Sequence, residues 1–387
     1  MGVWKTWFGM VSQLEGICTR QRTRLRLVVA LIGFSIRIEH LGVTSFIRAL
    51  GLNAFWYDRI LDFFNSPALC VQKLTSRWVS LVFSHFPLVR KNGRVILVGD
   101  GIKAPKTGRK MPRVKKLHQE SDNNNKPEYI FGHSFQSVGI LAGSEKSPFC
   151  VPFVARIHEG VVTSNRCAKT LLNKMIDLLQ SLAIQVPYYF LADNYYACQT
   201  IIKGLLSDGN HLVSRVKSNA VAYLPPPPKA PNKRGRNAVY GEKIKLRDLF
   251  MLPEGRCTIT SPLREDKNIK LDVCARDLIW RRVGIMVRFV AVSHPVKGDI
   301  ILLSTDLTLS PSEIIELYSL RFKIEVSFKQ AVRTMGGYFY HFWMRSMKRM
   351  PRKTGDQYLH RESEQYRDKV RRKIDAYHRF VQIGLIA

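Results

Sequence analysis

The stretch STDLTLSPSEIIELYSLRFKIEVSFKQ, residues 304–330, predicts a short strand followed by a capped helix. Ser310 suits the N-cap, Pro311 suits the first helical position, and Glu313 completes a capping box. Apolar side chains then recur on one arc of a 3.6-residue helix, at Leu317, Leu320, Ile324 and Phe328. We therefore expect this helix to bury that arc against a neighbouring layer.

A second stripe of the same helix is polar and chemically specific. Steps of three, four and four residues bring its members, Tyr318, Arg321, Glu325 and Lys329, to one face. An arginine binds phosphate oxygens in a fork, and a carboxylate binds hard cations. The alternative is a solvated face with ordinary ion pairs between turns. Taken alone, the helix favours the solvated face. Two aspartates elsewhere in the chain, described next, favour a binding site instead.

Two hydrophobic stretches each lead into an aspartate. Residues 94–101, RVILVGDG, predict a buried strand that ends at Asp100, between Gly99 and Gly101. Residues 187–196, PYYFLADNYY, predict a strand that ends at Asp193 and is followed by a helix. An acid beside a buried strand needs a partner or a metal ion. Each aspartate alone could merely cap the next turn, but together with Glu325 they suggest a site.

These residues resemble a known family, the DDE transposases of bacterial insertion sequences. The closer resemblance is to the branch with a Tyr-Arg-Glu-Lys signature and a β-rich insert before the last acid. Tyr318, Arg321 and Glu325 match the signature spacing, whereas Val332 stands at the position of its lysine. Lys329 and Arg333 flank that position as possible substitutes. The resemblance extends from about residue 94 to about residue 330 and is weak over the first ninety.

The resemblance implies a catalytic, metal-binding triad of Asp100, Asp193 and Glu325 that holds Mg²⁺ or Mn²⁺, as two ions. It also implies that Tyr318, Arg321 and Lys329, or Arg333, hold DNA phosphates. Residues 103–116 form a basic loop, in which we expect Lys103, Lys106 and Arg109 to contact DNA. The glycines of this loop fit neither a phosphate-binding nor a dinucleotide-binding motif.

The composition favours a nucleic-acid partner. The 387 residues carry 61 Lys and Arg against 30 Asp and Glu, a formal net charge of +31. A polyanion is the expected partner, with an anionic membrane surface as the alternative. The apolar run 25–36 is too short to span a bilayer. Seven cysteines without CxxC spacing argue against a zinc ribbon and fit a reducing cytosol. Together with this, the resemblance implies a cytoplasmic, nucleoid-associated bacterial protein.

The predicted fold is α/β, with a ribonuclease-H-like mixed-sheet core, a β-rich insert and an N-terminal helical domain. We expect helices in residues 1–90, the first part of the catalytic core in 91–220, a Pro-rich basic linker and β insert in 221–303, and the last part of the core with a basic helical segment in 304–387. Within these, 165–183, 195–206 and 345–379 are predicted helices. The N-terminal helices either grip DNA or pack on the core as a bundle.

The expected function is a DNA transposase that cleaves transposon ends and transfers the strands into target DNA, as a homodimer in the DNA complex. An inactive, truncated remnant that only binds DNA is one alternative. Its support is Val332 and the apolar terminus FVQIGLIA, which suggests a lost C-terminal helix or an interrupted gene. A cellular nuclease that hydrolyses without joining is another alternative.

Overall fold

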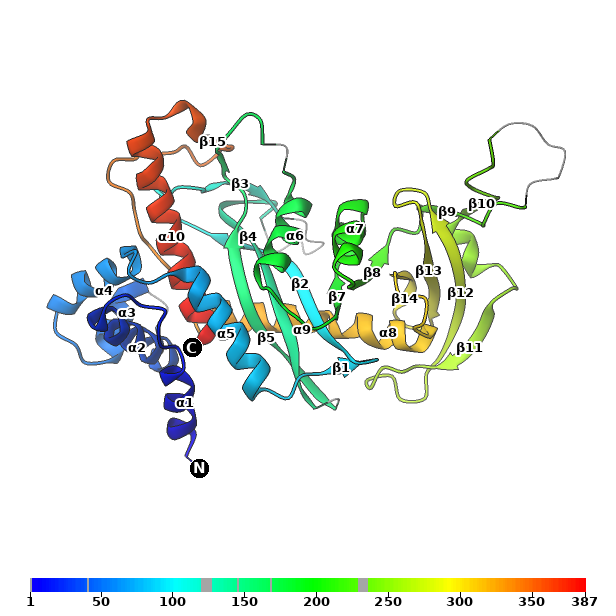
Figure 1. The fold of residues 1–387 in the computed structure, drawn as a ribbon, viewed down its shortest axis with the longest axis horizontal. Coiled ribbons are helices and arrows are strands. Elements are labelled where there is room, and N and C mark those ends of the chain that lie inside the picture. The colour runs from blue at the N-terminus through cyan, green and yellow to red at the C-terminus, as the bar shows by residue number, and fades with distance from the viewer. Residues whose placement is uncertain (1, 40–41, 120–126, 145, 168, 229–235) are drawn as a thin grey trace.

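The computed structural model describes residues 2–39, 42–119, 127–144, 146–167, 169–228 and 236–387 (Figure 1). Residues 229–235 of the predicted Pro-rich linker lie outside that description. A 13-stranded mixed sheet dominates the structure. Its strands are β1 (Arg90–Lys91), β2 (Arg94–Pro105), β3 (Lys115–His118), β4 (Tyr129–Ser144), β5 (Ser147–Ile157), β7 (Tyr188–Ala192), β8 (His211–Val216), β9 (Val221–Tyr223), β10 (Lys243–Lys245), β11 (Arg256–Thr260), β12 (Lys270–Trp280), β13 (Ile285–His294) and β14 (Gly298–Ser304).

Helices lie on both sides of this sheet and at one end of it (Figure 1). They are α1 (Val3–Ser12), α2 (Gln21–Ile36), α3 (Gly42–Ala49), α4 (Phe55–Asn65), α5 (Val71–His85), α6 (Leu171–Ser181), α7 (Gln199–Ser207), α8 (Pro311–Leu320), α9 (Phe322–Arg333) and α10 (Glu364–Ile386), with short 3₁₀ turns η1 (Asn194–Tyr196), η2 (Leu246–Phe250) and η3 (Leu359–Arg361). β6 (Val161–Val162) and β15 (Gln357–Tyr358) pair separately. None of the helices in the described ranges has both the length and the apolarity needed to cross a bilayer.

The centre of the sheet has the strand order β5-β4-β2-β7-β8. β4 runs antiparallel to β2 and to β5. β7 and β8 instead continue the sheet in parallel with β2. Helix α6 connects β5 to β7, and α7 connects β7 to β8. Three antiparallel strands followed by two parallel strands with helical connections is the ribonuclease-H-like arrangement, so the predicted fold class is confirmed.

Each face of the central sheet packs against a different set of helices. On one face, Met175 of α6 and Ile201 of α7 share a cluster with Phe190 of β7. On the other face, α8 and α9 bury their apolar arc against alternating residues of β2 and β7. The arc and its partners are Ile314, Leu317, Ile324, Phe328, Ile96, Val98 and Leu191. The amphipathic arc predicted for the signature helix is therefore confirmed.

Residues after β8 extend the same sheet instead of forming a separate layer. β14 pairs antiparallel with β8, and β13, β12 and β9 follow outward (Figure 1). The N-terminal helices lie at the opposite end, where Phe34, Phe46 and Phe64 pack around Phe380 of α10. Both ends thus share packing with the central core. The domain limits at residues 90, 220 and 303 stay predictions, and so does a DNA contact by the N-terminal helices.

Several element predictions were wrong in extent. Helix α6 begins only at Leu171, because Thr170 forms a capping box with Asn173. Residues 345–356 are not helical, since Pro351 lacks the amide that a helix interior needs. Helix α10 begins after Ser363, whose side chain accepts from the amide of Tyr366, and it continues to Ile386. The apolar run at its end is buried.

The signature helix also differs in one detail. The Ser310 capping box and Pro311 at the helix start are confirmed. The helix is divided at Arg321, which separates α8 from α9. Around that point the amide of Arg321 donates to Tyr318 and the amide of Ile324 donates to Arg321, both three residues back. This tighter turn lies at the polar stripe.

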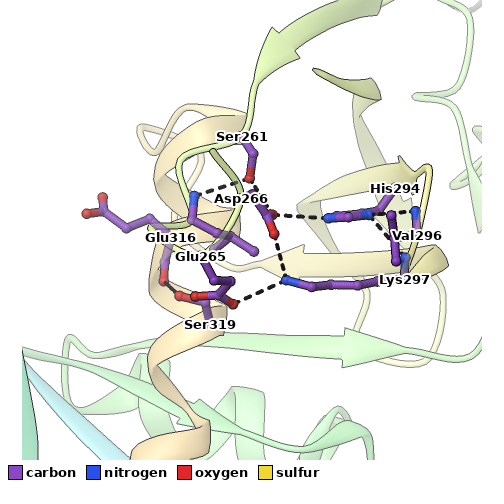
Figure 2. Close-up of polar contacts among 9 residues, drawn as sticks. Ser261, Glu265, Asp266, His294, Val296, Lys297, Glu316 and Ser319 are labelled. Carbon is purple, nitrogen blue, oxygen red and sulfur yellow. Dashed lines mark hydrogen bonds and ion pairs between the residues drawn. The ribbon is translucent and has the colours of Figure 1, made fainter. Parts of the chain in front are cut away.

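A buried carboxylate holds the far end of the insert beside α8 (Figure 2). Asp266 is 5% exposed and accepts from Ser261 Oγ at 2.7 Å, His294 Nε2 at 3.1 Å and Lys297 Nζ at 3.0 Å. Burial opposes ionisation of Asp266. The hydrogen bonds from Ser261, Lys297 and His294 outweigh it and hold the pKa below its ordinary value. The network joins the loop before β12 to the β13–β14 turn.

We predict that Asp266→Asn destabilises the fold by about 1–3 kcal/mol at neutral pH, because an amide cannot satisfy three donors. The carboxylate's contribution is present above the unfolded pKa and is lost as pH falls through the lowered folded pKa. The difference in melting temperature between variant and wild type should therefore shrink in acid. Equal melting temperatures at neutral pH would contradict this role.

Candidate functional site

The end of one strand ladder places two of the predicted acids next to each other. Parallel pairing between β2 and β7 stops at Gly99 and Ala192, so Asp100 and Asp193 follow on adjacent strands. Such strands lie about 4.8 Å apart. Asp193 directly follows β7, as predicted. Asp100 lies within β2 and not at its end, because β4 continues to pair with β2 as far as Pro105.

Gly99 is required by the close packing beside Asp100. A Cβ atom at this position would lie 2.4 Å from Cζ of Phe190, which reaches across from β7. Any larger residue would have to displace the fully buried ring of Phe190. The glycine before the acid is thus explained by packing.

The third acid approaches from a helix. Glu325 lies on α9, which packs against β2 and β5. Arg321 joins it to the sheet: Nη2 lies 2.8 Å from Glu325 Oε1, and Nη1 lies 3.6 Å from Asp100 Oδ2. The side chains of Arg321 and Asp100 are 17% and 25% exposed, so their contact is partly shielded from solvent, whereas Glu325 is 41% exposed. One guanidinium therefore connects Asp100 to Glu325.

The three acids share one electrostatic environment. Burial raises the pKa of Asp100 to about 6. The amide of Gly101, 2.7 Å from Oδ1, and the charge of Arg321 lower this pKa, whereas the charges of Asp193 and Glu325 raise it. These two charges act on Asp100 because Asp193 and Glu325 lie near it. Ionised Asp100 is thus costly without a cation.

The donor chemistry fits a hard divalent ion, since all three predicted ligands offer carboxylate oxygens. The side-chain placement is not that of an assembled metal centre. Among the described residues, no three His, Cys, Asp or Glu side chains are grouped so as to hold an ion. The Arg321 guanidinium supplies the positive charge between Asp100 and Glu325. The metal-binding triad therefore stays a prediction.

The remaining signature residues divide between the site and the surface. Tyr318 is half-buried, and Arg321 Cζ lies 5.9 Å from its ring centroid. Lys329 and Arg333 are exposed on α9. Val332, at the expected lysine position, packs partly buried against the larger hydrophobic cluster. Lys329 and Arg333 can therefore reach solvent, and Val332 has a packing role.

The three cations predicted from the basic loop have different environments. Lys103 is exposed, and its Nζ donates to the carbonyl of His118 at 2.6 Å. Arg109 is half-buried and donates from Nε to the carbonyl of Met350 at 2.7 Å. Lys106 is only 7% exposed, and burial lowers its pKa to about 7. Its ammonium faces the carbonyl of Tyr338, so this placement does not favour a DNA contact by Lys106.

Three residues near the acids were missed from the sequence. Tyr196 of η1 is buried and feels the charges of Asp100 and Asp193, and its hydroxyl contacts Gln136 of β4. Arg215 of β8 lies within electrostatic range of Tyr318. Arg215 is the exposed position between buried Ser214 and Val216. The alternation along β8 predicts that Arg215 is exposed. Its closeness to the acids can be inferred only once β8 is known to pair with β7.

The strand order and the acids at its centre define a ribonuclease-H-like protein. The chain belongs to the DDE superfamily endonuclease family, which matches residues 14–254. That span includes Asp100 and Asp193 and ends before Glu325. No curated protein matches the chain. Among solved structures, the chain aligns with the piggyBac transposase in its cryo-EM synaptic complex with hairpin DNA, at 11% identity and a TM-score of 0.38. The alignment covers 95% of this chain and 66% of the piggyBac chain, which is less than two thirds of it.

We predict that Asp100→Asn stabilises the metal-free protein at about pH 8, by roughly 1–3 kcal/mol. The folded-state pKa of Asp100 is raised from 3.8 to about 6, so the folded state binds its proton more tightly than the unfolded state does. Stability therefore falls as pH rises from about 4 to about 6, and asparagine removes that loss. Thermal melting in a chelator, at high and low pH, measures the effect.

The control is Asp62→Asn on α4, an exposed acid outside the site. This substitution should not change the pH dependence. An Asp100→Asn variant that is less stable than wild type at high pH, or equally stabilised at all pH values, would contradict the assigned burial.

Proposed function

We propose that this chain is a DNA transposase that cuts the ends of a mobile element and joins the freed 3′ ends to target DNA. Two observations support it most: Asp100 and Asp193 follow on adjacent strands of a ribonuclease-H-like sheet, and Arg321 contacts both Asp100 and Glu325. Membership of an endonuclease family supports cleavage of a phosphodiester. The joining step rests on the resemblance to insertion-sequence transposases.

Asp100, Asp193 and Glu325 would hold two divalent ions, Mg²⁺ or Mn²⁺, which when bound supply Lewis-acid chemistry at the phosphodiester. The chain's own residues orient the DNA. Arg321 presents a fork of donors that matches a phosphate, and it lies beside Tyr318 at the edge of the site. Phosphoryl transfer depends mainly on such positioning and charge neutralisation.

The proposed partner is DNA, both as element ends and as target. A net charge of +31 favours binding to the backbone, and this binding should weaken steeply with salt. Holding two DNA ends at once calls for two subunits, so we propose a homodimer in the DNA complex. An insertion-sequence origin in the bacterial nucleoid completes the proposal and follows from the same resemblance.

We predict that the protein cleaves DNA carrying the inverted repeats that flank its gene, when Mg²⁺ or Mn²⁺ is added. Asp100→Asn, Asp193→Asn and Glu325→Gln should each reduce cleavage by roughly 100-fold or more, since each removes a charge at the reacting phosphate. Gel analysis of end-labelled DNA measures cleavage, and a labelled 3′ end in a larger product measures joining.

Two acids outside the site provide matched controls. Asp177→Asn on α6 and Glu316→Gln on α8 alter acids that pair with Lys169 and Lys91, respectively. Both variants should keep wild-type cleavage. Cleavage that survives all three site substitutions would refute the assigned triad, and cleavage without joining would indicate a hydrolytic nuclease.

One observation favours a second candidate, a DNA-binding remnant without activity. Val332 stands where the signature has lysine, and it packs against the hydrophobic cluster instead of facing solvent with Lys329. Salt-sensitive DNA binding by the wild type, with no cleavage in either metal, would support the remnant over the active enzyme.

A further inference from the structure

A groove of about 550 Å³ lies away from the acids, where three distant segments meet. One side is the end of α4, one is the segment around residue 343, and one is the first half of α10. The residues that matter here are Asn65, Trp343, Arg345, Lys369, Arg372 and Lys373. No assigned role of the catalytic site uses this groove.

The groove is positive and lacks compensating acids. Four cations line it, and no carboxylate does. In the described part of the chain, none of these four forms an ion pair, because the nearby acids Glu364 and Asp368 contact Arg367 and Arg371 instead. Lys373 donates to Asn65 Oδ1 at 2.8 Å, and burial lowers its pKa. Such a surface attracts an anion.

Trp343 adds an aromatic surface to this charge. Its side chain is 64% exposed, although an indole of this size is normally buried. One edge of the indole packs against Gly108. A Cβ atom added to residue 108 would lie 2.7 Å from the indole Nε1. The next residue, Met344, donates its amide to the carbonyl of Lys110 at 2.8 Å. The ring is therefore held at one edge and remains accessible to solvent.

The groove is also connected to the proposed catalytic centre. The loop beneath Trp343 follows β2, the strand that carries Asp100. Pro105 ends this strand roughly 17 Å from Asp100, at about 3.3 Å a residue. Arg109 and Lys110 of the loop contact the segment that carries Trp343. Exposed Lys103 and Lys110 lie along the chain between Asp100 and the contact with this segment, so cations are available to a nucleic acid that continues from the acids toward the indole.

We infer that this groove binds an unpaired stretch of nucleic acid, with a base stacked on Trp343 and phosphates held by Arg345, Lys369 and Arg372. The inference rests on the proposed DNA function and adds that the DNA substrate contains an unpaired stretch. Bases inside a duplex have both faces covered by their neighbours, so an indole can stack only on an unpaired base or on a terminal pair. Exposed aromatics beside cations bind single strands in this way.

The test measures binding of two fluorescent probes, an oligo-dT strand of about twenty nucleotides and a relaxed, covalently closed circular duplex, which has neither unpaired bases nor terminal pairs. Trp343→Ala should weaken binding of the single strand by roughly 5- to 100-fold and leave duplex binding nearly unchanged. Trp343→Phe should restore much of the loss. Lys369→Gln and Arg372→Gln should each lower the slope of log affinity against log salt by about 0.7 for the single strand.

The control variants keep the same chemistry elsewhere. Trp4→Ala on α1 removes an indole of nearly the same exposure, 65%, and Lys267→Gln removes an exposed cation of the insert. Both should bind like the wild type. Circular dichroism confirms that each variant is folded.

Each outcome decides between the inferences. Equal binding by Trp343→Ala and wild type, or equal losses for both probes, overturns this inference and leaves the proposed DNA function intact. A wild type that binds neither probe overturns both. Displacement of the single strand by a poly-glutamate peptide at similar concentration would identify an acidic protein segment as the occupant and overturn the nucleic-acid assignment.

Discussion

Parallel pairing of β2 with β7 is the constraint on which the proposed site depends. The two strands are buried on both faces, with Leu97 beside Phe190 and Val98 beside Leu191. A slip of one residue would exchange the side chains between the two faces and their separate helix layers, so the register is strongly fixed. This register alone brings Asp100 next to Asp193.

Charge balance is the second determinant. Two neighbouring carboxylates disfavour each other's ionisation, and burial of Asp100 adds to that cost. Arg321 offsets it because the apolar arc of α9 fixes the helix against the sheet, within reach of Asp100 and Glu325. In the proposed reaction, DNA phosphates would pair with the Arg321 guanidinium, and Asp100 and Glu325 would then be available to hold divalent cations. The two changes would be complementary in charge, so substrate binding would favour assembly of the site.

Much of this organisation is local, and local features could be predicted from the sequence. The capping box at Ser310, the arc through Ile324 and Phe328, and the strands leading to the two aspartates all depend on residues close together in the chain. The ribonuclease-H-like core could be predicted from the order in which its strands and helices occur along the chain. Asp100 was predicted at a strand end, but β4 is long enough to extend the pairing of β2 to Pro105.

Long-range packing accounts for what could not be predicted. Lys106 lies in a basic loop, yet Tyr338, 232 residues later, accepts from its ammonium in the core. The bridge from Arg321 to Asp100 depends on how closely α9 approaches β2. The groove at Trp343 forms only where the end of α4, the segment around residue 343 and the first half of α10 meet. None of these contacts has a signal within a short window of sequence.

The most direct test of the account is anomalous X-ray scattering from crystals grown with saturating Mn²⁺. We expect anomalous density next to the carboxylates of Asp100 and Asp193, with Glu325 as a further ligand and with Arg321 turned away from Asp100. Mn²⁺ bound only elsewhere, with Arg321 still in contact with Asp100 and Glu325, would contradict the proposal that these three acids form a metal-dependent catalytic centre.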